Sequence, residues 1–160
     1  MSNNLQSRIE SKDAKIGVVG LGYVGLPLAV EFAKAGFTVT GIEISQERVD
    51  QLNRGDNYIS DVDNSELSAF VESGRFVSTS DYSVVSHLDA VSICVPTPLS
   101  KLKDPDVSFI QSALDELVKY IHSGLLVILE STTYPGTTRE LILPSLTAKG
   151  AEVGKDLFLC

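Results

Sequence analysis

The sequence predicts an α/β fold: a doubly wound parallel sheet of about six strands with helices on both faces. The first observation behind this prediction is that short apolar segments alternate with longer segments whose apolar residues recur at helical spacing. The second is that the short segments are apolar almost throughout, which is typical of parallel strands buried on both faces of a sheet. The third is a glycine-rich turn at residues 20–25, between the first strand and the first helix. Together these observations indicate a Rossmann-type domain.

Each expected strand is a short apolar or β-branched run bounded by a glycine, a proline or a polar residue. The first strand, KIGVVG, leads directly into the glycine-rich turn. The fourth, AVSICV, stops at Pro96, because proline has no backbone N–H to donate within a sheet. The expected strands cover residues 15–20, 37–44, 76–78, 90–95, 125–129 and 156–160.

The segments between the strands carry helical periodicity and the residues that begin helices. Ser45 and Asp63 are suited to cap two helices, and Glu66 is placed to complete a capping box with Asp63. Residues 56–63 are expected to be irregular, and Asp81 is expected to cap one short turn. The expected helices cover residues 23–35, 45–53, 63–74, 107–122 and 136–149.

Length and composition describe one ordinary globular domain. At about 150 residues per domain there is room for one, which we expect over residues 14–160 after a polar N-terminal tail, residues 1–13. The 13 basic and 21 acidic residues give 13 − 21 = −8, so nucleic acid is not an expected partner. No apolar run approaches the roughly 18 residues of a membrane span, and the polar N-terminus does not look like a secretory signal. We therefore expect a cytoplasmic protein.

The two cysteines indicate neither a disulfide scaffold nor a metal site. Cys94 and Cys160 lie far apart in the sequence, and neither belongs to a Cys/His cluster with the spacing of metal ligands. Cys94 lies inside an apolar strand and is expected in the core. Cys160 ends an apolar strand. We therefore expect either a buried, unreactive thiol or a residue that is terminal only because the sequence is truncated there.

Residues 20–25, GLGYVG, form the pattern G-x-G-x-x-G, and their position between a strand and a helix points to a dinucleotide. Gly20 permits the tight turn, Gly22 lets the backbone approach a pyrophosphate, and Gly25 lets helix and strand pack closely. Glu43 ends the next strand, 43 − 25 = 18 residues later, where a carboxylate binds ribose hydroxyls and repels a 2′-phosphate. This favours NAD over NADP. The alternative interpretation is that the glycines serve only tight turns.

Other polar groups are expected beside this turn. Tyr23 and Val24 would present backbone N–H groups to phosphate at the positive end of the helix. Arg48 is an argument against the preference for NAD, since its guanidinium could pair with a 2′-phosphate. It could equally pair with the ribose or with its own helix neighbours. Two polar loops follow the fourth and fifth strands, at residues 95–99 (VPTPL) and 130–138 (ESTTYPGTT), where ligands bind in such sheets. Their hydroxyls are equally suited to stabilise loops and helix caps.

Four segments are more specific in combination: VGLGYVGLPLA at residues 19–29, CVPTPL at 94–99, PDVSFI at 105–110 and ESTTYPGTT at 130–138. Together they resemble the UDP-glucose/GDP-mannose dehydrogenase family, and within it the UDP-N-acetylhexosamine 6-dehydrogenase branch. The resemblance covers nearly all of residues 14–160, but only the NAD-binding domain of the family. It implies NAD as cofactor, a UDP-sugar as the substrate of the whole protein, and a role in surface polysaccharide synthesis. Family members oxidise the sugar C6 alcohol to a carboxylate in two steps, using two NAD and a cysteine that forms covalent intermediates.

The resemblance also implies roles for individual residues. It places residues 23–24 on the pyrophosphate, Glu43 on the ribose and Arg48 close to it. Thr97 and Thr132 match threonines near the nicotinamide, and Thr132 also matches a threonine that helps to position the catalytic water. Glu43 departs from the aspartate more usual in the family, although its longer side chain can still reach a ribose.

The other catalytic residues of the family have no counterpart in these 160 residues. Its acid/base glutamate, lysine, asparagine, nucleophilic cysteine and aspartate would all follow Cys160. We therefore expect this chain to bind NAD without turnover, and the whole protein to add a substrate domain and to form a homo-oligomer. Two alternatives stay open: a hydroxy-acid or 6-phosphogluconate-type dehydrogenase with the same first domain, and an NAD-sensing module without catalysis.

Overall fold

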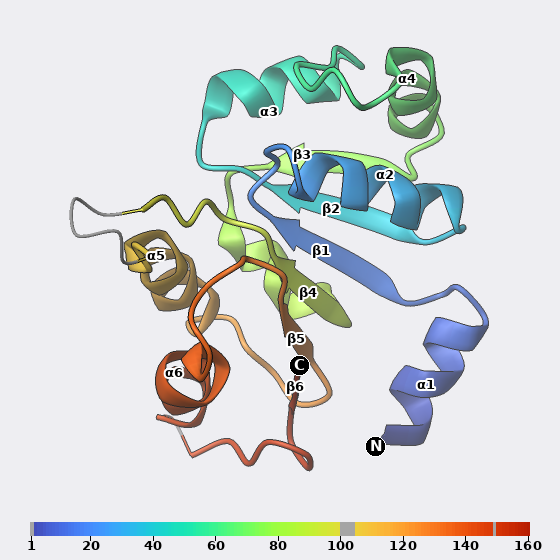
Figure 1. The fold of residues 1–160 in the computed structure, drawn as a ribbon. Coiled ribbons are helices and arrows are strands. Elements are labelled where there is room, and N and C mark those ends of the chain that lie inside the picture. The colour runs from blue at the N-terminus through green and yellow to red at the C-terminus, as the bar shows by residue number, and fades with distance from the viewer. Residues whose placement is uncertain (1, 100–104, 149) are drawn as a thin grey trace.

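A computed structural model describes residues 2–99, 105–148 and 150–160 of the chain. Six strands form one sheet in the order β3-β2-β1-β4-β5-β6, and every neighbouring pair is parallel (Figure 1). The chain therefore fills the sheet outward from β1 in one direction and then in the other, which confirms the predicted doubly wound fold. The strands are β1 Lys15–Val19, β2 Thr38–Ile42, β3 Phe76–Thr79, β4 Ala90–Ile93, β5 Leu126–Leu129 and β6 Phe158–Leu159.

Helices cover both faces of the sheet. Figure 1 shows α2, α3 and α4 on one side and α5 and α6 on the other, and a separate cluster of buried apolar side chains fills each side. Within the described residues, no helix is both long and apolar enough to cross a membrane. The helices are α1 Ser2–Glu10, α2 Gly25–Lys34, α3 Gln46–Asn53, α4 Asn64–Glu72, α5 Ser108–Leu117 and α6 Leu143–Thr147, with a 3₁₀ turn at Tyr82–His87 and a π-helical turn at Thr138–Ile142.

The predicted caps at Ser45, Asp63 and Asp81 are confirmed, and the Asp81 carboxylate accepts from the backbone N–H of Ser83. The Ser45 hydroxyl accepts from the backbone N–H of Arg48, and the Asp63 carboxylate accepts from two backbone N–H groups at the start of α4. The second half of the predicted capping box is wrong. Glu66 turns its carboxylate to Lys34, 2.7 Å away, because an ion pair between α4 and α2 is available to it.

The helix expected over residues 107–122 is shorter than its periodicity predicts. It begins at Ser108 and ends at Leu117. The chain then leaves the helix, and Nε2 of His122 lies 2.9 Å from the carbonyl oxygen of Leu88, just before β4. After Leu117 the chain forms turn-type hydrogen bonds at Lys119 and Tyr120, and it then contacts the segment before β4.

The last expected helix, residues 136–149, is broken into a π-helical turn followed by α6, and its expected end lies outside the described residues. Pro144 explains the change. It has no backbone N–H, so it cannot donate to the carbonyl of Glu140 as an α-helix requires, and its ring would crowd that carbonyl. The wider turn before Pro144 relieves this crowding.

The polar tail expected over residues 1–13 contains helix α1. Nη1 of Arg8 lies 2.5 Å from Oδ1 of Asp89, and Nη2 of Arg8 donates to the carbonyl of Asp13 at 3.2 Å. The other carboxylate oxygen of Asp89 accepts from the backbone N–H of Lys15 at 2.7 Å. Asp89 therefore ties α1 to the first residue of β1.

We expect Arg8→Ala to lower the free energy of unfolding by about 1–2 kcal/mol, because Asp89, whose side chain is only 13% exposed, loses its charged partner. Chemical denaturation followed by circular dichroism measures this change. Lys155→Ala is the matched control, since it removes an ion pair whose side chains are 72% and 66% exposed. It should change stability by less than about 0.5 kcal/mol. Equal effects of the two substitutions would contradict the anchoring role of Arg8.

Candidate functional site

The glycine-rich turn lies at the carboxyl end of β1, where the strand order reverses. Gly20 has a φ of +86°, a left-handed conformation that favours glycine, and a Cβ there would lie 2.9 Å from the carbonyl oxygen of Cys94. A Cβ on Gly25 would lie 1.8 Å from the carbonyl oxygen of Gly20. No side chain fits in that space, so Gly25 sets the close packing of α2 on β1 that the sequence predicts.

Gly22 differs from these two glycines because nothing in the protein crowds it. A Cβ on Gly22 would meet no atom within 4 Å and would project into open space. Within the described residues, the backbone N–H groups of Gly22, Tyr23 and Val24 donate to no protein acceptor. An unobstructed backbone with three unused donors at a helix N-terminus suits an anionic group.

Leu21 fixes the turn from the core side, a role that the pattern G-x-G-x-x-G does not specify. Its side chain is fully buried and packs on Gly41 of β2, where a Cβ would lie 2.6 Å from the Leu21 Cδ1. Its N–H donates to Oε2 of Glu43 at 3.1 Å, and its carbonyl accepts from the Tyr58 hydroxyl at 2.8 Å. The available signal was a glycine inside a strand, which marks close approach of another group.

Glu43 is almost completely buried, with 5% of its surface exposed. Its other oxygen, Oε1, accepts from the backbone N–H of Ser45 at 3.1 Å, so both oxygens bind the protein backbone. Nη1 of Arg48 lies 4.0 Å from Oε2. Each carboxylate oxygen has two acceptor positions, so Glu43 can still accept hydrogen bonds from a ligand.

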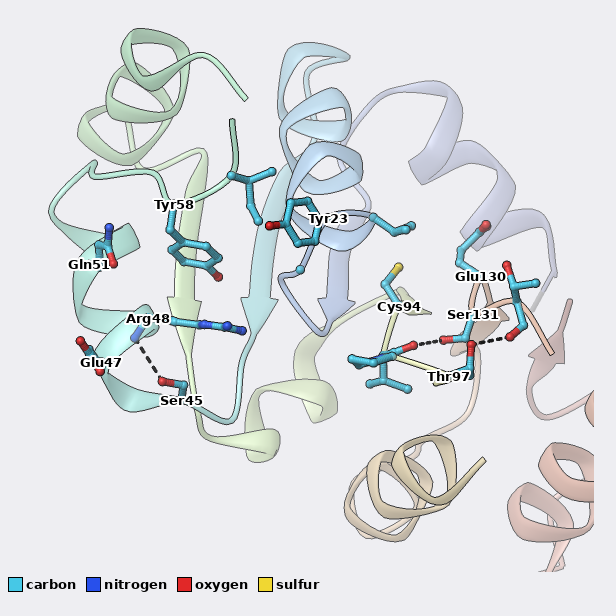
Figure 2. Close-up of a pocket in the computed structure, with 16 residues that line it drawn as sticks. Tyr23, Ser45, Glu47, Arg48, Gln51, Tyr58, Cys94, Thr97, Glu130 and Ser131 are labelled. Atoms are coloured by element: carbon cyan, nitrogen blue, oxygen red, sulfur yellow. Dashed lines mark hydrogen bonds between the residues drawn. The ribbon is translucent and has the colours of Figure 1, made fainter. Parts of the chain in front are cut away.

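Arg48 and Tyr58 stack beside this carboxylate. The Arg48 guanidinium carbon lies 5.2 Å from the centre of the Tyr58 ring, a cation–π contact that Figure 2 shows from the side. Burial, together with the charge of Glu43, raises the pKa of Tyr58 to about 12. Tyr58 therefore keeps its proton at neutral pH and donates it to the turn. The sequence offered no signal for Tyr58, which lies in the irregular segment before α4.

Two cavities flank the glycine-rich turn. The first, of about 650 Å³, extends over the turn from α3 to the loops after β4 and β5. The second, of about 510 Å³, lies between the end of β2 and α5, and two exposed apolar side chains, Ile44 and Phe109, line it. The predicted residues Gly22, Tyr23, Val24, Arg48, Thr97 and Thr132 line the first cavity, and Gly20, Gly22, Glu43 and Arg48 line the second. Gly25 lines neither, since it packs inside.

The loops after β4 and β5 meet at the far end of the first cavity. The Thr97 hydroxyl donates to the carbonyl oxygen of Thr132, and the Ser131 hydroxyl donates to that of Val95 (Figure 2). Thr132 itself is exposed, and its hydroxyl has no protein partner in the part of the chain that the structure describes. The sequence predicted that these loops carry the site, but it did not predict which hydroxyls bind the protein.

Cys94 has the environment of an unreactive thiol, and Cys160 lines neither cavity. Cys94 is buried as predicted, and its burial raises the pKa of the thiol to about 11, so it stays protonated. The prediction that Cys160 is buried is wrong: it is exposed, and it lies one position beyond β6, as the last residue of the sequence. Among the described residues, no group of three or more His, Cys, Asp or Glu side chains is arranged to hold a metal ion.

Sequence comparisons identify relatives of this chain. A profile of the UDP-glucose/GDP-mannose dehydrogenase family, NAD binding domain, matches residues 14–158. The chain is 39% identical over 148 residues to the UDP-N-acetyl-D-glucosamine 6-dehydrogenase of Pseudomonas aeruginosa, covering 92% of this chain and 34% of that protein. It is 38% identical over 128 residues to the UDP-N-acetyl-D-mannosamine dehydrogenase of Escherichia coli K12, covering 80% of this chain and 30% of that protein. The chain thus spans about a third of the length of these relatives.

Solved structures that resemble this chain also include those of nucleotide-sugar dehydrogenases. An NDP-N-acetyl-D-galactosaminuronic acid dehydrogenase from Methanosarcina mazei matches with a TM-score of 0.84 and 35% identity, over 97% of this chain and 36% of that one. The native UDP-N-acetyl-mannosamine dehydrogenase from Staphylococcus aureus matches with a TM-score of 0.82 and 32% identity, over 91% of this chain and 35% of that one.

Substitution by alanine should have a large effect on stability at Gly25 and a small one at Gly22. We expect Gly25→Ala to destabilise the chain by at least about 3 kcal/mol or to prevent folding, because the added methyl group collides with the Gly20 carbonyl. Gly22→Ala should change stability by less than about 1 kcal/mol, since its methyl group enters open space. Thermal and chemical denaturation of the two variants provide the comparison. A stable Gly25→Ala protein would refute the packing constraint.

Proposed function

The chain belongs to the UDP-glucose/GDP-mannose dehydrogenase family as its NAD-binding domain, and from this premise we propose how the chain holds NAD and what the whole protein does. The observation that carries the cofactor proposal is the open backbone at Gly22. Its neighbours Tyr23 and Val24 add unused N–H groups at the N-terminus of α2. These features support a pyrophosphate bound across the turn, with Gly20 and Gly25 shaping the backbone beneath it.

The adenosine half of NAD would occupy the second cavity. Glu43 lies at its base, where its remaining acceptor positions suit the ribose hydroxyls, and Arg48 borders the same space. Ile44 is 94% exposed and Phe109 is 47% exposed, so both offer apolar surface to the flat purine ring. A buried carboxylate repels a 2′-phosphate, which supports NAD over NADP.

The nicotinamide half would lie at the other end of the first cavity, between Thr97 and Thr132. When bound, NAD supplies the hydride acceptor for oxidation of an alcohol. In our proposal the chain holds that ring beside the free hydroxyl of Thr132. A hydroxyl both donates and accepts, so Thr132 is also suited to orient a water molecule next to the ring.

We extend the proposal to the whole protein through its relatives. Two of them are named as dehydrogenases of UDP-N-acetyl-D-glucosamine and UDP-N-acetyl-D-mannosamine. We propose that the whole protein oxidises the C6 alcohol of a UDP-N-acetylhexosamine to a uronic acid with two NAD, for surface polysaccharide synthesis. A cytoplasmic location and a homo-oligomeric state are part of the same proposal.

Glu43→Ala is expected to weaken NAD binding by about 1.5–3 kcal/mol, because it removes charge-assisted hydrogen bonds to the ribose. Isothermal titration calorimetry measures the change, with circular dichroism to confirm that the variant is folded. Glu47→Ala is the control, since Glu47 is an exposed acid that lines the first cavity at the start of α3. It should bind NAD with nearly unchanged affinity. Unchanged affinity in Glu43→Ala would remove the ribose assignment.

The whole protein should produce NADH from UDP-N-acetylglucosamine or UDP-N-acetylmannosamine, with two NADH formed for each sugar oxidised. The absorbance of NADH measures the yield in a panel that also contains UDP-glucose, 6-phosphogluconate and simple hydroxy acids. Activity confined to 6-phosphogluconate or a hydroxy acid would contradict the substrate proposal.

The Thr132 hydroxyl is proposed to orient the catalytic water. Thr132→Val removes this hydroxyl, so it should slow turnover of the whole protein about 10²-fold or more, measured by the same NADH absorbance.

A further inference from the structure

Two side-chain hydrogen bonds join the loop after β4 to the loop after β5. Oγ1 of Thr97 donates to the carbonyl oxygen of Thr132 at 2.5 Å, and Oγ of Ser131 donates to the carbonyl oxygen of Val95 at 2.8 Å. The bonds run in opposite directions, because each loop supplies one hydroxyl and one carbonyl (Figure 2). We refer to this pair of bonds as the β4–β5 clamp.

The clamp continues the connection between the two strands beyond the sheet. The last paired residues are Ile93 and Leu129, and the backbone N–H groups of Glu130 and Ser131 then both donate to the carbonyl oxygen of Ile93, at 3.0 and 3.1 Å. Past that point the strands diverge into loops. The hydroxyls of Thr97 and Ser131 hold the loops together where the backbone alone no longer does.

The two threonines of this region use their hydroxyls differently. A threonine hydroxyl has one proton to donate, and Thr97 gives its proton to the protein backbone. Thr132 gives its carbonyl to the clamp and keeps its own hydroxyl free, at an exposed position on the wall of the first cavity. The clamp therefore fixes the backbone that carries the free hydroxyl.

We propose that Thr97 and Ser131 are positioning residues, which aim the Thr132 hydroxyl at the nicotinamide end of NAD instead of binding the cofactor through their own protons. This proposal rests on the proposed NAD site. At this end of the cavity the Thr132 side chain would contact the cofactor, and the side chains of Thr97 and Ser131 would hold Thr132 in place.

The location of the clamp separates this role from a purely structural one. Thr97 and Ser131 lie in partly exposed loops at the rim of the sheet, and neither belongs to the two buried apolar clusters. Hydrogen bonds in such loops contribute little to global unfolding, because the loops can open without the core. Loss of the clamp should therefore appear in the binding of the nicotinamide half and not in the melting temperature.

Calorimetric titration of the chain with NAD and with ADP-ribose, which lacks the nicotinamide ring, tests the proposal. Thr97→Val keeps the side-chain shape and removes the hydroxyl. We expect the affinity for NAD to fall about fivefold, while the affinity for ADP-ribose and the melting temperature stay unchanged. Thr97→Ser keeps the donor and should restore the affinity for NAD. Ser131→Ala should reproduce the selective loss, and the double variant should lose less than the product of the two single losses.

Thr133→Val is the control. The hydroxyl of Thr133 contacts that of Thr137 in the loop after β5 and takes no part in the clamp. It should leave the ratio of the two affinities unchanged. An equal ratio change in Thr133→Val would mean general loosening of the loop and would overturn the proposal. A loss in Thr97→Val without any loss in Ser131→Ala would overturn it too, because Thr97 would then bind the cofactor directly. Failure of the unaltered chain to bind either ligand would overturn the proposed NAD site together with the clamp.

Discussion

The packing of Gly25 against the carbonyl of Gly20 is the constraint on which the rest of the site depends. It brings the N-terminus of α2 down onto the end of β1, with no space for even one methyl group. The turn between them must then lie flat, with Leu21 pointing into the core and Gly22 pointing out. The three unused N–H groups belong to this same turn, and the two cavities lie on either side of it.

Local patterns were sufficient to predict the sheet and the turn. Strands such as β1 and β4 are apolar on both faces, which is typical of a parallel sheet covered by helices, and a glycine is required wherever backbone sterics leave no alternative. Tertiary contacts account for what was missed. The sequence around Tyr58 predicts an irregular segment, and nothing in it shows that the hydroxyl reaches Leu21, 37 positions away. Helix α1 depends in the same way on Asp89, which is distant in the sequence.

The amino-acid composition alone could not predict how this site binds an anion. A net charge of −8 gives no general attraction for an anionic dinucleotide, so binding must rely on local dipoles. The structure supplies these at the turn, where two backbone N–H groups and a nearby arginine also stabilise the Glu43 carboxylate. The sequence predicted the positions of the acid and the threonines. Their partners could not be predicted, because hydrogen bonds between loops depend on where two strands end in space.

The two cavities share four lining residues: Gly22, Arg48, Val95 and Pro96. A ligand with two halves joined by a short bridge can fill both, and once one half is seated the other faces its own cavity at a high effective concentration. The covalent bridge would then raise the affinity above that of either half alone. Such a site would bind an intact dinucleotide more tightly than either of its mononucleotide halves, because the second half binds without a further loss of translational freedom.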